Sequence, residues 1–170
     1  MFFSRLIPAI TIALGLMSLQ AASDTLNAPN GPVLLRVSGA IESTNAEGGA
    51  EFDLDMLRAL GESEIVTETI WTPGTHSFTG VRLKDLLDHL GATGGTIEAT
   101  AINDYSVTIP VSDATERGPI IAYEMDGKQL SRREKGPLWV IYPFSSSSDY
   151  RTEVIYSRSI WQLDRITIKE

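Results

Sequence analysis

The sequence predicts a single α+β domain with mixed, short-stranded sheets and a few helices. Short runs of β-branched and aromatic residues alternate with turn residues, two leucine-containing segments have helical spacing, and no repeat divides the chain. The clearest strand-forming region is 100–143, in which Asp126-Gly127 and Gly136-Pro137 mark turns between apolar runs. We expect these runs to form a sheet with one polar rim, and we look for function at that rim.

The first 22 residues have the composition of a secretory signal peptide. Arg5 carries their only charged side chain, an apolar segment follows at 10–17, and small residues come next at 21–23. This apolar segment is shorter than the roughly 20 residues that a membrane span needs. We therefore predict a signal peptide at 1–22 that is cleaved, and a periplasmic or secreted protein with no membrane span after cleavage. An uncleaved N-terminal anchor is the alternative.

The remainder of the chain divides into a linker and one domain. Residues 23–32 are polar and contain Asn and Pro, which favours an extended linker. Residues 33–170 have the usual length of a single domain and are long enough to bury a core.

Charge and cysteine content exclude several classes of function. The chain has 22 acidic and 14 basic side chains, a formal net charge of −8. This balance argues against nucleic-acid binding, which needs clustered Lys and Arg, and against general attraction to anionic lipid. The chain has no cysteine, which rules out disulfides, thiolate nucleophiles and thiolate metal ligands.

The first half of the domain is predicted to contain two strands and one short helix. A strand is expected at 33–39, followed by a loop with Asn and Gly at 41–50. Apolar residues within 52–60 have the spacing of one helix face and precede a glycine. The β-branched composition of 64–71 predicts a second strand, and Pro and Gly then predict a turn at 72–76.

The second half begins with the clearest helix signal in the chain. Leucines at the first, fourth, fifth and eighth positions of 83–90 lie on one face of a helix predicted over 81–90, and Gly91 is suited to end it. The serine-containing segment 144–149 predicts an exposed loop. The segment 150–157 has no decisive pattern, and the alternation over 160–168 predicts a terminal strand.

Four motifs in this order resemble the oxidoreductase molybdopterin-binding domain family, which has the sulfite oxidase fold. They are an aromatic-x-Gly-Val-x-Leu helix motif at 78–92, a strand at 103–110 similar to the family's Asp-Gly-Tyr strand, an Asp-Gly turn followed by a Gly-Pro-Leu-Trp strand at 125–143, and a closing strand at 158–166. The resemblance implies a sulfite-oxidase-like molybdopterin-binding domain and makes molybdopterin a candidate cofactor.

The chain departs from this family at the metal ligand. In catalytic members a cysteine after the strand that precedes the Gly-Val-x-Leu helix binds molybdenum, whereas segment 67–74 here has no sulfur. Hydroxyl and indole groups do not replace a soft thiolate ligand, so we expect no Cys-ligated molybdenum. The chain is also shorter than the catalytic members.

The resemblance points to five residues near the expected cofactor side. Trp71 and His76 flank the loop where the cysteine would lie, and Asn103, Asp104 and Tyr105 correspond to a rim that faces the cofactor. Each has a simpler interpretation. Trp71 also suits a core position, His76 an exposed turn, and Asn and Asp often stabilise turns through their own side chains.

Basic residues gather in only a few places in this acidic chain. Arg132 and Arg133, with Lys135, are close in sequence, and Arg117 and Arg151 lie elsewhere. These five residues, Arg132 and Arg133 foremost, are candidates for holding a phosphate or carboxylate through paired hydrogen bonds. A solvated charged loop is the alternative interpretation.

Three functional classes fit these observations. The preferred class is a non-catalytic binding module, sensory or accessory in role, that holds a small anionic ligand such as a pterin. The second is a molybdenum-cofactor-dependent oxidoreductase whose metal has no cysteine ligand. The third is a protein–protein interaction module with a periplasmic partner, in which side chains such as Trp71 fill the position of the family's cofactor pocket. Whether the chain is an enzyme stays open, with a non-enzyme preferred.

Overall fold

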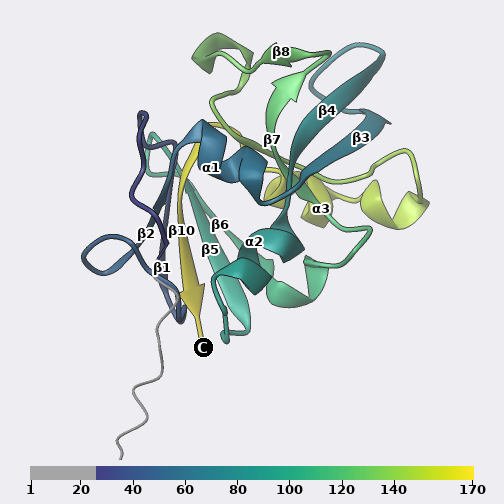
Figure 1. Ribbon diagram of the computed structural model, residues 1–170. Helices are drawn as coiled ribbons and strands as arrows, with labels where there is room; N and C mark the ends of the chain where they lie inside the picture. Colours follow the sequence, from purple (N-terminus) through teal and green to yellow (C-terminus); the bar gives the residue numbers. More distant parts are fainter. Residues whose placement is uncertain (1–25) are drawn as a thin grey trace, which may run out of the picture.

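The fold is built from two β-sheets with short helices packed against them (Figure 1). The computed structural model describes residues 26–170, so the predicted signal peptide and the first residues of the predicted linker lie outside the described residues. No helix within this range has the length and apolar character that crossing a membrane requires.

The first sheet places a strand from the end of the chain between strands from its beginning and middle. Its order is β2-β1-β10-β5-β6, in which β1 runs parallel to β10 and the other neighbours are antiparallel. The strands are β1 (Leu35–Gly39), β2 (Gly49–Phe52), β5 (Thr96–Ala101), β6 (Ser106–Pro110) and β10 (Leu163–Lys169). In β5 the alternate residues Ile97, Ala99 and Ala101 are buried, as expected for a strand with one face on the core.

The second sheet is antiparallel and has β7 at its centre. Its order is β3-β4-β7-β8, and β9 also pairs with β7. The strands are β3 (Glu62–Glu68), β4 (Thr75–Arg82), β7 (Ile120–Met125), β8 (Lys128–Gln129) and β9 (Trp139–Ile141). The first four residues of β7 are all buried, which explains why its sequence is a continuous apolar run without alternation.

Three short α-helices and three 3₁₀ turns connect these strands. The α-helices are α1 (Leu54–Ala59), α2 (Leu83–His89) and α3 (Glu153–Arg158), and the 3₁₀ turns are η1 (Val111–Asp113), η2 (Arg132–Glu134) and η3 (Ser148–Tyr150). Helix α1 contacts strands of both sheets, β2 and β4. Helix α2 buries Leu83, Leu86 and Leu87, as its leucine spacing predicts, and it ends next to Gly91.

The observed architecture confirms the α+β prediction, and the differences lie at element boundaries. Phe52 belongs to β2 and not to the predicted helix, and Val81 belongs to β4 because its backbone pairs with Ile121. The predicted loop at 41–50 runs into the short strand β2. The segment without a decisive pattern forms η3 and α3. The core between the elements is a single cluster whose largest fully buried side chains include Trp139, Tyr123, Tyr142 and Phe78.

Asp53 connects the first described residues to helix α1. Its buried carboxylate accepts hydrogen bonds from the backbone N–H groups of Met56 at 2.9 Å, and of Asn30 and Gly31 at 2.8 Å each. The bond from Met56 is an N-cap of α1. These backbone hydrogen bonds, that from Met56 first, lower the pKa of the Asp53 carboxyl below its ordinary value.

The stability of the fold is expected to depend on the charge of Asp53. Because its pKa is lowered in the folded state, its contribution is complete above the ordinary value of 3.8 and is lost as the pH falls through the folded value. We expect the free energy of unfolding of the wild type to fall more steeply than that of Asp53→Asn between about pH 5 and about pH 3. Urea titrations over this range measure the difference.

Asp55→Asn is the matched control, since the Asp55 side chain is 93 % exposed and lies in the same helix. Parallel pH profiles of the wild type and Asp53→Asn would contradict the assigned role of Asp53.

Candidate functional site

Trp71, which follows β3, and four other aromatic side chains that surround it form one cluster. The Trp71 ring makes edge contacts with the rings of Trp139, Phe144, Tyr156 and Trp161, at centroid distances of 5.7, 6.1, 5.8 and 5.7 Å. Edge contacts of this kind are a favoured arrangement of aromatic rings. Trp139 is fully buried and Trp161 is 39 % exposed, so the cluster runs from the core to the surface.

A cavity of about 400 Å³ opens beside this cluster, and we call it the aromatic pocket. Most of its wall is apolar, and its polar groups are hydroxyls, one amide and the backbone. The lining residues are Trp71, Ala101, Asn103, Tyr105, Tyr156, Ser157, Ser159, Ile160 and Trp161. Among these described residues none is charged. An apolar cavity with a few polar groups is the usual form of a small-molecule site.

The turn between β5 and β6 supplies one wall of the aromatic pocket. The Asn103 carboxamide oxygen accepts a hydrogen bond from the backbone N–H of Tyr105 at 3.2 Å, which closes the turn. Asp104 has a left-handed backbone with φ of 66°, and its carboxylate pairs with Arg165. This turn leaves the Tyr105 side chain 56 % exposed at the pocket mouth.

Helix α3 supplies another wall and is anchored at both ends. The Thr152 hydroxyl accepts a hydrogen bond from the backbone N–H of Ile155 at 3.3 Å and caps the helix. At the other end, Arg158 pairs with Asp113 at 2.9 Å, and the Tyr142 hydroxyl donates to the same carboxylate at 2.7 Å. Burial, together with this hydrogen bond, raises the pKa of Tyr142, so its hydroxyl stays a donor.

A loop that contains η2 lies next to the Trp161 side of the aromatic pocket. The Gln162 backbone N–H donates to the Lys135 carbonyl, and the Gln162 side-chain amide donates to the Arg132 carbonyl, both at 2.9 Å. The Lys135 ammonium lies over the Trp161 ring, 4.7 Å from its centroid, and 5.7 Å from that of Trp139. The loop is thereby held against the pocket wall.

The structure brings three of the sequence-predicted site residues into one cavity. Trp71, Asn103 and Tyr105 all line the aromatic pocket, although Trp71 lies more than 30 positions before the other two. Asp104 lies in the same turn, but its carboxylate is engaged by Arg165. Whether these residues bind a ligand stays a prediction.

His76 belongs to β4 of the second sheet and does not line the aromatic pocket. Its Nδ1 is 2.7 Å from an Asp126 carboxylate oxygen, and its Nε2 is 3.0 Å from the Pro73 carbonyl oxygen. The hydrogen bond to Asp126 raises the pKa of His76, and burial opposes the rise. His76 therefore ties the β3–β4 turn to the β7–β8 turn.

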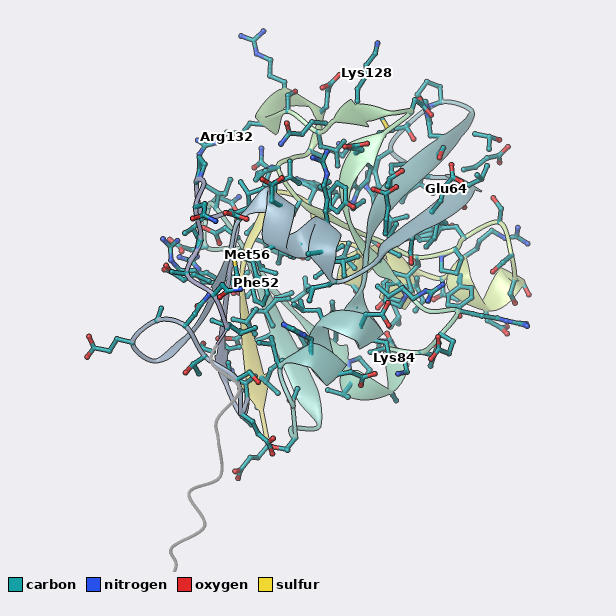
Figure 2. The ribbon with its side chains drawn as sticks, in the orientation of Figure 1. Phe52, Met56, Glu64, Lys84, Lys128 and Arg132 are labelled. Carbon is teal, nitrogen blue, oxygen red and sulfur yellow. The ribbon has the colours of Figure 1, made fainter. Side chains whose placement is uncertain are left out.

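Arg132 and Arg133 are exposed residues of η2, and neither lines the aromatic pocket. Figure 2 shows Arg132 and Lys128 at the outer edge of the molecule. The contact of Arg132 with the pocket side is through its backbone carbonyl, which accepts from Gln162.

Sequence reasoning missed the half of the aromatic pocket that follows residue 150. Tyr156 and Ser157 come from α3, while Ser159, Ile160 and Trp161 come from the segment that leads into β10. One usable signal for this half of the pocket was the pair Tyr156 and Trp161, two aromatic residues five positions apart in a short polar segment.

The comparisons with known proteins define the class of this protein. The family described as "oxidoreductase molybdopterin binding domain" matches residues 50–148, more than half of the chain. The chain therefore belongs to the oxidoreductase molybdopterin-binding domain family. The matched range includes Trp71, Asn103 and Tyr105 and ends before α3, so part of the aromatic pocket lies outside it.

A solved structure gives the fold relationship in more detail. The chain is similar to the crystal structure of the sulfane dehydrogenase SoxCD from Paracoccus pantotrophus, with a TM-score of 0.59 and 16 % sequence identity. The similarity covers 79 % of this chain and only 37 % of that one. It confirms the sulfite-oxidase-like fold, and the chain corresponds to about a third of that protein. The comparison with curated proteins found no match.

The residues of the aromatic pocket fit part of the family's cofactor. The aromatic rings suit a planar pterin ring. The chain has no cysteine, and within residues 26–170 no group of three or more His, Asp or Glu side chains could hold a metal ion. The described lining contains no basic side chain, and the Lys135 ammonium lies over the ring of one lining residue, Trp161. The pocket therefore fits a planar ring and does not fit a protein-ligated molybdenum ion.

Proposed function

We propose that this chain is an exported, non-catalytic binding protein that holds a small planar ligand in the aromatic pocket, in a sensory or accessory role. The observation that carries the proposal is a cavity with four aromatic side chains and no protein ligand for a metal among its described lining residues. The predicted signal peptide supports export to the periplasm or beyond.

A pterin is the first ligand to test, because the family's description names molybdopterin. Rings such as those of Trp71, Tyr105, Tyr156 and Trp161 stack on or meet the edge of a planar ligand, and each such contact contributes about 0.5–1.5 kcal/mol beyond area burial. The Asn103 amide and the serine hydroxyls supply hydrogen-bonding groups that would orient a heterocycle.

Cofactor content separates binding from molybdenum chemistry. The protein is expressed with its N-terminal segment in a host that makes molybdopterin, and molybdenum and pterin are then measured by elemental analysis and fluorescence. Pterin without stoichiometric molybdenum supports the proposal. Stoichiometric molybdenum in a purified sample that turns over a substrate would establish an oxidoreductase.

An interaction module is the second candidate, and exposed apolar residues favour it. Tyr105 and Val154 are each 56 % exposed, and Trp161 is 39 % exposed, on or near the rim of the aromatic pocket. A periplasmic protein that covers this rim would bury them. A sample that binds no pterin and recovers one stable partner at stoichiometric amount would favour this function.

Trp161→Ala is expected to weaken pterin binding about ten-fold while it leaves the fold intact. The reason is that Trp161 lines the aromatic pocket and is partly exposed, so its removal takes away a ligand contact of about 1.4 kcal/mol with little loss of core packing. Calorimetric titration with pterin measures the affinity, and circular dichroism checks the fold.

Val154→Ala is the matched control, because Val154 is an exposed apolar residue of α3 that does not line the pocket. Equal affinities of Trp161→Ala and the wild type would argue against the aromatic pocket as the binding site.

A further inference from the structure

We propose that the aromatic pocket selects planar ligands that carry a negatively charged group, and that the Lys135 ammonium anchors this group. This inference rests on the proposed function, because it names the class of ligand for the same pocket. It assigns the charge recognition to Lys135, and not to Arg132 or Arg133.

The first argument is the position of the Lys135 ammonium. It lies 4.7 Å from the centroid of the Trp161 ring, and Trp161 forms part of the pocket wall. Lys135 is itself half-buried, so its side chain lies along the aromatic surface and does not extend freely into solvent. A ligand that contacts the Trp161 ring would therefore lie near this cation.

The second argument is that this ammonium has no counter-charge. Across residues 26–170 Lys135 forms no salt bridge, whereas the carboxylates of the neighbourhood are engaged elsewhere. Glu134 accepts from the Ser131 hydroxyl, and Asp104 pairs with Arg165. Asp164 Oδ1 lies 3.3 Å from Arg165 Nε but is buried without a hydrogen-bond partner among the described residues. A cation that is held near an apolar cavity without an anionic partner favours an anionic ligand there.

The third argument is the backbone that holds Lys135 in place. Only four non-glycine residues in the described chain have positive φ, and three of them adjoin the aromatic pocket: Asp104 at 66°, Lys135 at 70° and Gln162 at 53°. Left-handed backbone at non-glycine residues is strained and tends to occur where function requires it. Gln162 fixes the loop through two hydrogen bonds, to the Lys135 and Arg132 carbonyls, so the backbone that carries the cation is held in place.

The charge of the loop strengthens the same conclusion. Arg132 and Arg133 are exposed on the segment that Gln162 holds, and neither forms a salt bridge in the part of the chain that the structure covers. In a chain of net charge −8 this segment is a local positive region that would attract an anion towards the pocket. A quaternary ammonium ligand, which aromatic pockets also bind, would be repelled by Lys135.

The test compares pairs of probes that share a ring system, one with a carboxylate and one without a charged group. Pterin-6-carboxylate and unsubstituted pterin are titrated calorimetrically into the wild type, Lys135→Gln, Lys135→Arg and Lys128→Gln. The same comparison with naphthalene-2-carboxylate and 2-naphthalenemethanol separates charge recognition from recognition of the pterin ring. Lys128 is the control because it is an exposed lysine of β8 for which the described residues show no contact with a pocket ring, and its removal changes the net charge equally.

The wild type is expected to bind each carboxylate about five-fold more tightly than its neutral partner, the factor typical of one partly exposed ion pair. This preference should disappear in Lys135→Gln and persist in Lys135→Arg and Lys128→Gln. Equal affinity of charged and neutral probes for the wild type, or a preference that survives in Lys135→Gln, would overturn this inference and leave the binding function standing. If no probe binds, both the inference and the proposed function fail.

Discussion

Replacing Trp139 by alanine is expected to lower the free energy of unfolding by about 4 kcal/mol, within the range for large-to-small changes of buried aromatic residues. Trp139 is fully buried, its ring packs on Phe78 at 5.5 Å and Trp71 at 5.7 Å, and its indole N–H donates to the Ser159 carbonyl at 3.1 Å. Trp139→Ala would remove all three contacts and leave that carbonyl without its donor.

Chemical denaturation followed by circular dichroism measures the loss, which is a large part of the about 5–15 kcal/mol of a typical domain. Trp161→Ala is the internal comparison, since Trp161 belongs to the same aromatic cluster but is 39 % exposed. Its loss of stability should be well below that of Trp139→Ala. Similar losses of unfolding free energy for the two variants would mean that Trp161 is as important to the stability of the fold as the buried Trp139.

Gly39→Ala is expected to destabilise the fold by about 3 kcal/mol, through left-handed strain and overpacking together. Gly39 has φ of +92°, and a Cβ atom there would lie 2.0 Å from the Ile168 carbonyl oxygen. The same oxygen accepts a hydrogen bond from Ala40, so β10 cannot move away without losing it. Hydrogen exchange should accelerate along the β1–β10 pair, and thermal unfolding should shift to lower temperature.

Gly48→Ala separates the two causes of this loss. Gly48 also has positive φ, +78°, but a Cβ atom there meets nothing within 4 Å. Only the backbone strain should remain, about 1 kcal/mol. Equal losses for Gly39→Ala and Gly48→Ala would show that the close approach of β1 to β10 has no energetic consequence.

Much of the fold could be predicted because its signals are local. The leucine spacing of α2 and the β-branched runs of β3 and β7 depend on residues close in sequence, which pattern reasoning reads directly. The family motifs added the order of these elements. The boundary errors at Phe52 and Val81 arose because apolar residues in a strand that adjoins a helix continue the helix pattern.

The candidate site was only half accessible to the same reasoning. Trp71 and Tyr105 were identified from the resemblance, but α3 has six residues, too few to show a helical period. The contact of Trp71 with Trp161 joins positions 90 residues apart, and only the tertiary structure brings them together. The role of Lys135 likewise depends on a tether from Gln162 that no local pattern indicates.

The parallel pairing of β1 with β10 has a consequence for the order in which the fold forms. Strand β10 lies between β1 and β5, so the first sheet cannot assemble until the segment up to Lys169 is available to pair with both. Until then both neighbours present bare hydrogen-bonding edges, the kind of intermediate that aggregates or recruits chaperones. Closure of the first sheet therefore depends on β10, which joins the β2–β1 pair to the β5–β6 pair.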